Sequence, residues 1–167
     1  IEPKLEKDYD CALLIGVLEY GESYIGGEAP FEKFIKTIRK HVKKGGNIII
    51  AIENRYGMKY WAGCREDHNG QFFSGLENYP DKSPAKTFSR KELERICKGA
   101  GEKKVNFYYP YPDYKFPTEI FTDENVNGVN FGKLYRNYQK NRVNLFSENH
   151  MTSVLKEEKV MDVFANS

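Results

Sequence analysis

The chain has 167 residues, of which 40% are hydrophobic and 30% are charged, which suits one compact domain with a buried core. Its 26 basic and 24 acidic residues nearly balance, so composition gives no sign of a nucleic-acid or polybasic membrane surface. No apolar run is long enough to span a bilayer, and the start, IEPKLEKDYD, lacks a signal-peptide core. Three widely separated cysteines show no metal-ligand spacing. We expect one cytoplasmic domain over residues 1–167, without metal, nucleic acid or membrane span.

The first elements form a strand, helix and strand pattern. Residues 11–18 (CALLIGVL) are a short apolar run, typical of a strand buried on both faces. A helix is predicted from Pro30, closed by the basic run at residues 40–44 and ended by the glycine pair Gly45-Gly46. Residues 47–52 (NIIIAI) predict the next strand. This order indicates a βαβ unit with two parallel strands.

A second helix is predicted after Ser89, where Glu92 completes a capping box and glycines at 99 and 101 mark the end. Residues 105–109 (VNFYY) read as a further strand, and the proline-rich segment that follows fits only an edge or a wall. Beyond Thr122 the pattern weakens, with a short helix predicted over residues 134–143 and a terminal strand over 159–166.

The loop over residues 53–79 is the most informative segment, because it leaves the carboxyl end of a predicted strand. Ligands of open α/β sheets bind at such ends. His68 beside Glu66 and Asp67 has the strongest acid–base potential, although a loop histidine beside acids is often merely solvated. Four further residues could hydrogen-bond or stack on a sugar, or else pack the loop onto the sheet: Asn54, Arg55, Tyr60 and Trp61.

Glu19 follows the first predicted strand and could hold a polar group of a cofactor or substrate, or be an exposed turn carboxylate. The glycines between this strand and the first helix match neither the dinucleotide fingerprint nor the Walker pattern. An ordinary βα loop is the better interpretation.

The segments YDCALLIGVLEY, VKKGGNIIIAIEN and FSRKELERICKGAG resemble the second half of a class I S-adenosylmethionine-dependent methyltransferase. Asp10, the Lys43–Gly46 turn and the Phe88–Leu93 helix start match motifs of that family. The long loop, together with YYPYPDYKFPTEIF, is similar to a bacterial subgroup found with glycosyltransferases in cell-surface polysaccharide synthesis. The resemblance covers roughly residues 8 to 125.

The resemblance implies an α/β fold, the second half of a Rossmann-like sheet with a parallel βαβ unit and terminal antiparallel strands. The glycine turn and ribose-binding acid of the family are not in this sequence and would precede Ile1, so we expect a part of a longer protein. S-adenosylmethionine would bind the full-length parent, its methionine end bordered by Gly16, Val17, Leu18 and Glu19. The isolated chain is expected to self-associate through the surface that the missing half would cover.

The implied activity is methyl transfer to a sugar or glycan hydroxyl, with His68 as the base and Asp67 or Glu66 assisting. Glu53, Asn54, Arg55 and Tyr60 would position the acceptor, and a fused or neighbouring glycosyltransferase is the expected partner. Two alternatives stay open. One is a non-catalytic glycan-binding or docking module with the same fold, and the other is an α/β enzyme that uses a different nucleotide.

Overall fold

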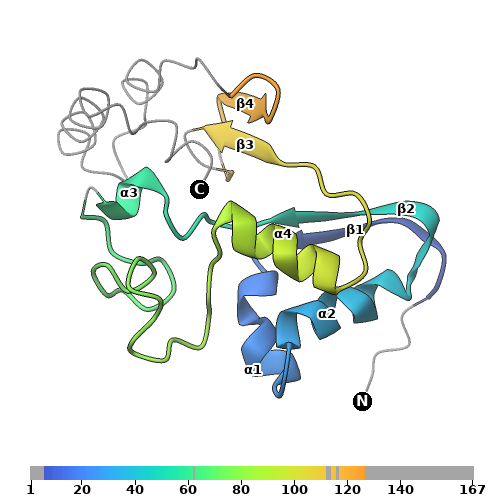
Figure 1. The fold of residues 1–167 in the computed structure, drawn as a ribbon, viewed down its shortest axis with the longest axis horizontal. Coiled ribbons are helices and arrows are strands. Elements are labelled where there is room, and N and C mark those ends of the chain that lie inside the picture. Colours follow the sequence, from blue (N-terminus) through green and yellow to red (C-terminus); the bar gives the residue numbers. More distant parts are fainter. Residues whose placement is uncertain (1–5, 62, 112–113, 116, 127–167) are drawn as a thin grey trace.

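The computed structural model describes residues 6–61, 63–111, 114, 115 and 117–126. These residues form a mixed α/β arrangement with a two-stranded parallel sheet and a separate two-stranded antiparallel sheet (Figure 1). The predicted α/β class is therefore confirmed. The helix predicted over residues 134–143 and the strand predicted over 159–166 lie outside the described residues. Among the helices of the described part, none has the length and apolar character needed to cross a bilayer.

The parallel sheet confirms the predicted βαβ unit. Strand β1 (Tyr9–Ile15) pairs in parallel with β2 (Val42–Ala51), in the register Cys11↔Asn47 through Ile15↔Ala51. Between them come a 3-10 turn, η1 (Leu18–Tyr20), and two helices, α1 (Gly21–Ile25) and α2 (Pro30–Arg39). Because the strands are parallel, their carboxyl ends meet at the same edge of the sheet, next to helix α3 (Met58–Trp61) and the long loop (Figure 1).

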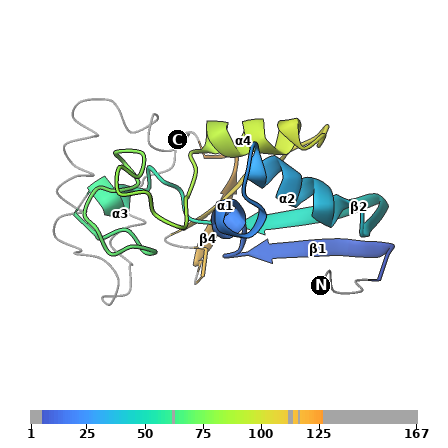
Figure 2. The same cartoon turned by 90° about the horizontal axis from the view of Figure 1, so that it is seen from below.

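The core lies on one face of this sheet. Helices α2 and α4 (Arg90–Gly99) run along the same side of the strands (Figure 2). Their apolar stripes meet Ile48, Ile50 and Ile52 of the second strand and its extension. Leu18 and Ile35 are the most completely buried side chains of the cluster. Because successive side chains of a strand point to opposite faces, every second residue from Ile48 to Ile52 faces this core.

The opposite face of the sheet is apolar but exposed. Leu13, Ile15 and Ile49 are 60%, 55% and 51% exposed, and Leu13 and Ile49 are directly paired. Parallel sheets normally bury both faces. The described residues thus leave an apolar surface that fits a covering partner, and self-association stays a prediction.

The glycine pair does not end a helix, as the sequence analysis expected. Helix α2 ends at Arg39, and Gly45 and Gly46 lie inside β2, where the register with β1 becomes irregular. Gly45 has φ +82°, and a Cβ on Gly46 would lie 2.6 Å from Val42 Cγ1 and 2.7 Å from the Asp10 carbonyl oxygen. Close backbone approach to β1, rather than helix termination, therefore explains these glycines. The basic run likewise does not close a helix, because Lys43 and Lys44 belong to β2.

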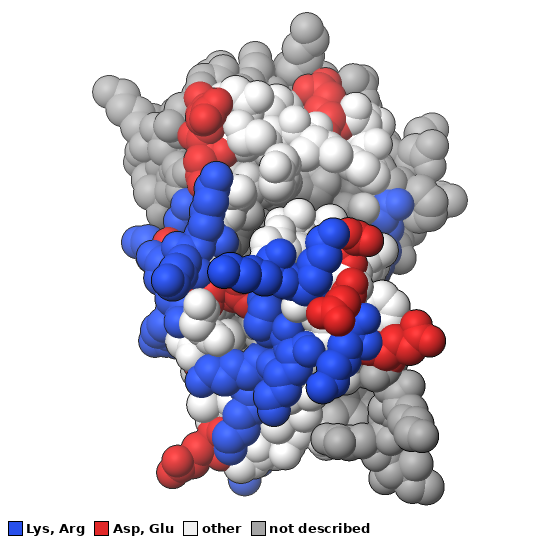
Figure 3. Space-filling model, turned by 90° about the vertical axis from the view of Figure 1, so that its right-hand side faces the viewer, with Lys and Arg blue, Asp and Glu red and all other residues white. Residues whose placement is uncertain are grey.

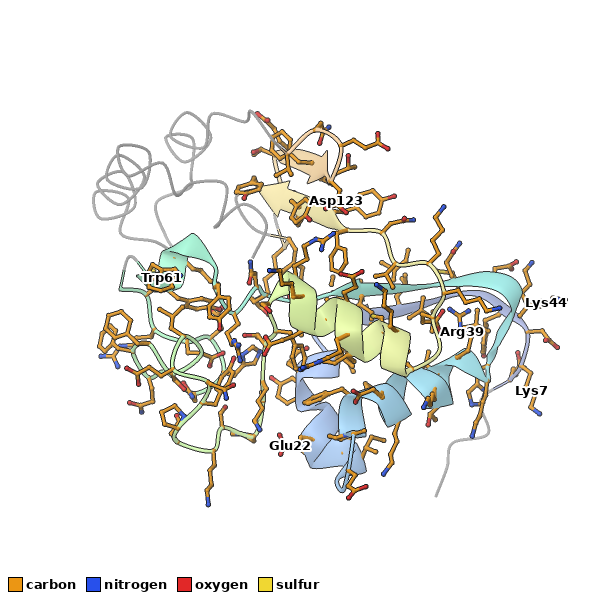
Figure 4. The ribbon with its side chains drawn as sticks, viewed as in Figure 1. Lys7, Glu22, Arg39, Lys44, Trp61 and Asp123 are labelled. Carbon is orange, nitrogen blue, oxygen red and sulfur yellow. The ribbon has the colours of Figure 1, made fainter. Side chains whose placement is uncertain are left out.

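Helix α4 begins as predicted, with a complete capping box in which Ser89 Oγ accepts from the Glu92 amide and Glu92 accepts from the Ser89 amide. The strand predicted over residues 105–109 is displaced to β3 (Tyr108–Tyr111), which pairs antiparallel with β4 (Glu119–Thr122). Arg90 joins helix and hairpin, donating to Tyr109 Oη at 2.9 Å and to Asp123 Oδ2 at 3.1 Å (Figure 4). Such long-range contacts fix the hairpin.

One end of the molecule is basic although the net charge is near zero. Figure 3 shows lysines and arginines gathered over the end where α2 leads into β2 and α4 leads towards β3. Arg39 and Lys44 both lie there (Figure 4). Lysines 43, 44, 103 and 104 are all exposed. They line one end of a cavity of about 1330 Å³ between β2, α4 and residues 101–111.

Gly46→Ala should destabilise the chain, because the new methyl group meets backbone and a branched side chain at less than 3 Å. We expect a loss of roughly 1–3 kcal/mol in the free energy of unfolding, measured by urea denaturation. Gly99→Ala is the matched control. That glycine ends α4, and its nearest neighbour would be Glu32 Cγ at 3.1 Å, at the flexible side chain of α2. Equal effects of the two substitutions would contradict the close-approach explanation.

The cysteines should differ in reactivity. Burial raises the pKa of the Cys97 thiol to about 11, and Cys97 belongs to the core, whereas Cys11 is exposed. Raising the pH from 7 to 9 therefore leaves Cys97 neutral and unreactive in the folded chain. Iodoacetamide labelling mapped by mass spectrometry should modify Cys11 and spare Cys97 at both pH values, until denaturant is added. Labelling of Cys97 in the native chain would show that this part of the core opens readily.

Candidate active site at the carboxyl ends of β1 and β2

Glu19 is buried at the carboxyl end of β1. The strand stops at Ile15, earlier than predicted, because Gly16 turns the chain with φ +60°. The following 3-10 turn anchors Leu18 in the core, which holds Glu19 only 2% exposed. Its Oε2 atom is buried without a hydrogen-bond partner. Glu19 is thus a buried carboxylate, and not the exposed turn carboxylate that the sequence also allowed.

Glu53 occupies the corresponding position after β2. It is 6% exposed, and its Oε1 accepts a hydrogen bond from Lys115 Nζ at 2.9 Å. Its other oxygen, Oε2, is buried without a partner. Burial acts to lower the pKa of Lys115, but its bond to Glu53 outweighs burial and raises it. Lys115 therefore keeps its positive charge beside Glu53.

Glu66 organises the turn that carries the histidine. One carboxylate oxygen accepts from the amides of His68 and Asn69, at 2.7 and 2.9 Å. The other oxygen, Oε1, lies at hydrogen-bond distance, 2.8 Å, from His68 Nδ1. Burial acts to raise the pKa of Glu66, but these hydrogen bonds outweigh it and lower the pKa. An ionised, buried carboxylate thus holds the ring and the backbone of the turn together.

His68 lies between two glutamates. Its Nδ1 bonds to Glu66, and its Nε2 faces Glu19 Oε1 at 3.6 Å, an ion-pair distance that is long for a hydrogen bond. Interaction with Glu19 and Glu66 raises the pKa of His68 to about 10. In this arrangement the ring carries a proton at neutral pH. Tyr20 packs edge-on against it with centroids 5.7 Å apart, and the His68 side chain is only 9% exposed.

Asp67 turns away from the imidazole. Its Oδ2 accepts from Lys59 Nζ at 2.5 Å and from Tyr60 Oη at 2.9 Å. Burial acts to raise the pKa of Asp67, but the bond from Lys59 outweighs it and lowers the pKa. Tyr60 is buried, and burial, followed by Asp67, raises its pKa. The structure therefore brings His68 and Glu66 together, whereas the Asp67 side chain bonds to residues of helix α3.

The remaining predicted residues mainly support the loop. Asn54 is exposed, and its Oδ1 accepts from the Tyr56 amide at 2.9 Å. Arg55 is buried and binds Asn78 Oδ1 at 2.7 Å and Glu92 Oε1 at 2.9 Å. Arg55 thereby ties the loop to the capping box of α4.

Sequence reasoning missed several members of this network. Lys115 reaches Glu53 from beyond β3, and the loop-packing Tyr79 hydroxyl binds Thr87, at 2.7 Å, as well as approaching Glu66. Asn69 donates to Ser74 Oγ at 2.8 Å and to Asp81 Oδ2 at 2.7 Å. The density of Asn, Asp and Tyr in the loop was the available signal, but no spacing rule assigns these partners.

Comparison with protein-family models, with curated proteins and with solved structures gives no match. The functional interpretation accordingly depends on the site itself and on the sequence pattern.

Glu66→Gln should destabilise the loop. An amide replaces one acceptor oxygen with a donor facing either the imidazole N–H or two backbone N–H groups. We expect a loss of about 2 kcal/mol or more in the free energy of unfolding, and faster hydrogen exchange at the His68 and Asn69 amides. Glu77→Gln, exposed on the same loop, is the control and should change stability by less than about 0.5 kcal/mol. Unchanged exchange in Glu66→Gln would show that Glu66 does not hold the turn.

Proposed function

We propose that this chain is the C-terminal part of an S-adenosylmethionine-dependent methyltransferase that acts on a sugar or glycan hydroxyl. The supporting observation is the meeting of Glu19, Glu53 and His68 where two parallel strands end. Sites of open α/β sheets are built at that edge. The finer fold that goes with this proposal is the second half of a Rossmann-like sheet, and its uncovered apolar face suits contact with the remainder of the protein.

The segment proposed to border the cofactor partly fits that role. Gly16 has the positive φ that lets the chain turn back, and Val17 is partly exposed beside it. Leu18 has its side chain wholly in the core, so only its backbone could border a ligand. Glu19 faces the same pocket as His68. These residues would form one wall of the cofactor pocket.

When bound, S-adenosylmethionine would supply an electrophilic methyl group for the acceptor oxygen. The acceptor hydroxyl must lose its proton, and we assign that proton to the Glu19 carboxylate, because the His68 ring beside it already carries one at neutral pH. Glu66 fixes the ring through Nδ1, so that Nε2 and the Glu19 carboxylate share the open side. Most of the remaining rate acceleration would come from holding the acceptor oxygen in line with the carbon–sulfur bond.

Acceptor binding is assigned to the rim of the loop. Glu53 and its partner Lys115 offer polar groups beside the pair, and Trp61, 41% exposed, offers an aromatic ring for a sugar face. Asn54 is exposed nearby, whereas Tyr60 and Arg55 would act by holding the loop. A fused or neighbouring glycosyltransferase remains the proposed source of the glycan.

Glu19→Gln and His68→Gln should each lower turnover by roughly two to four orders of magnitude, with little loss of cofactor binding. The assay is transfer of labelled methyl groups to a panel of rhamnose-, mannose- and galactose-terminated oligosaccharides, using the full polypeptide that contains this chain. Glu22→Gln is the matched control, because Glu22 lies in the adjacent turn, at the surface, paired with Lys86 (Figure 4). The control should keep normal turnover.

Near-normal turnover in both pocket variants would contradict the assigned proton acceptor. Saturable oligosaccharide binding with no methyl incorporation would instead favour the non-catalytic glycan-binding alternative.

A further inference from the structure

Three potential metal ligands meet in the pocket from three separate segments. One carboxylate oxygen of Glu19, one of Glu53 and one imidazole nitrogen of His68 all lie within 4.8 Å of one another. The three residues follow β1, follow β2 and sit in the long loop, respectively. No two of them are close enough in sequence for a ligand-spacing motif, which is why the sequence analysis expected no metal.

The pocket leaves buried oxygens unsatisfied. Glu19 and Glu53 are 2% and 6% exposed, and each has one carboxylate oxygen with no hydrogen-bond partner. Buried carboxylate oxygens are normally paired or bind a cation, because desolvating them without compensation is costly. Two glutamates with such oxygens, grouped with one imidazole, suit a bound cation.

The histidine is oriented as metal-binding histidines usually are. Nδ1 lies 2.8 Å from the Glu66 carboxylate, which leaves Nε2 directed to Glu19. A carboxylate that accepts the second ring N–H fixes the tautomer and the ring plane of a ligating histidine. Glu66 is itself held by two backbone amides, so the orientation is built into the turn.

We propose that Glu19, Glu53 and His68 bind one divalent transition-metal ion, of the type of Zn²⁺ or Mn²⁺. A mixed carboxylate and imidazole set suits these ions better than Mg²⁺, which prefers oxygen ligands alone. Three carboxyl groups, those of Glu19, Glu53 and Glu66, meet one ammonium group, that of Lys115, so the side chains around the site are predominantly acidic.

Binding requires a small contraction of the site. Ligand atoms around a tetrahedral zinc ion are about 3.4 Å apart, given bonds of roughly 2.1 Å, so a pair 4.8 Å apart must close by about 1.4 Å. Rotation of glutamate side chains covers such a distance. The ion takes the Nε2 lone pair, and any proton held there leaves to solvent.

This inference does not rest on the proposed transferase activity. Cation binding without methyl transfer would leave it standing, whereas methyl transfer in excess EDTA by a chain that binds no cation would refute it and leave the transferase proposal intact. If both hold, an ion beside the acceptor hydroxyl would favour loss of its proton.

The test is isothermal titration of the EDTA-treated, desalted 167-residue chain with ZnCl₂, MnCl₂ and MgCl₂. We expect one site, with zinc bound more tightly than manganese and magnesium bound weakest. Glu19→Gln and Glu53→Gln should abolish measurable binding or weaken it at least tenfold, and Glu66→Gln should weaken it about 10–100-fold. Glu77→Gln, which leaves the pocket intact, should bind as the wild type does.

A second measurement uses the wild-type chain and so does not depend on how the variants fold. Substoichiometric Mn²⁺ should broaden the NMR signals of the His68 ring before those of His41, which lies at the amino end of β2 with its Nδ1 at the Glu6 carbonyl oxygen. Equal broadening of the two rings, or zinc binding unchanged in both Glu19→Gln and Glu53→Gln, would overturn the proposal.

Discussion

The parallel pairing of β1 and β2 is the constraint on which the candidate site depends. Both strands run in the same direction, so the chain leaves them at one edge, and Glu19 and Glu53 meet there although they are distant in sequence. An antiparallel pair would place them at opposite ends. The irregular register at Gly46 lets β2 begin at Val42 and still bring Ala51 beside Ile15.

Local interactions explain what the sequence could predict of the fold. The capping box at Ser89 and the apolar run of β2 involve neighbouring residues, and both were found where expected. The glycine pair was misassigned because glycine serves a helix end and a close backbone approach equally well. Only contact with Asp10, across the sheet, distinguishes the two. The displaced third strand has the same cause, since pairing with β4 determines where it begins.

The candidate site divides in the same way. Glu66 and His68 interact within one turn, so their proximity could be read from the sequence. Asp67 lies between them in sequence, but its side chain contacts Lys59 and Tyr60. Successive side chains in this turn point in different directions. Lys115 could not be assigned, since it reaches Glu53 across more than sixty positions of the chain. The balance of charges in the pocket thus depends on tertiary contacts, which the sequence alone does not reveal.

The pocket also contains groups that lower the free energy of unfolding. An unpaired buried carboxylate oxygen costs roughly 1–3 kcal/mol or more, and the structure contains one on Glu19 and one on Glu53. The loop around them makes many internal hydrogen bonds, through Asn69, Tyr79 and the terminal nitrogens of Arg55, although Arg55 Nε is also buried without a partner. Two such oxygens at one edge of the sheet suit the proposed cation site, because apolar residues at those two positions would fold more easily. Arg55 differs from Glu19 in that its terminal nitrogens bind Asn78 and Glu92, which ties the loop to α4.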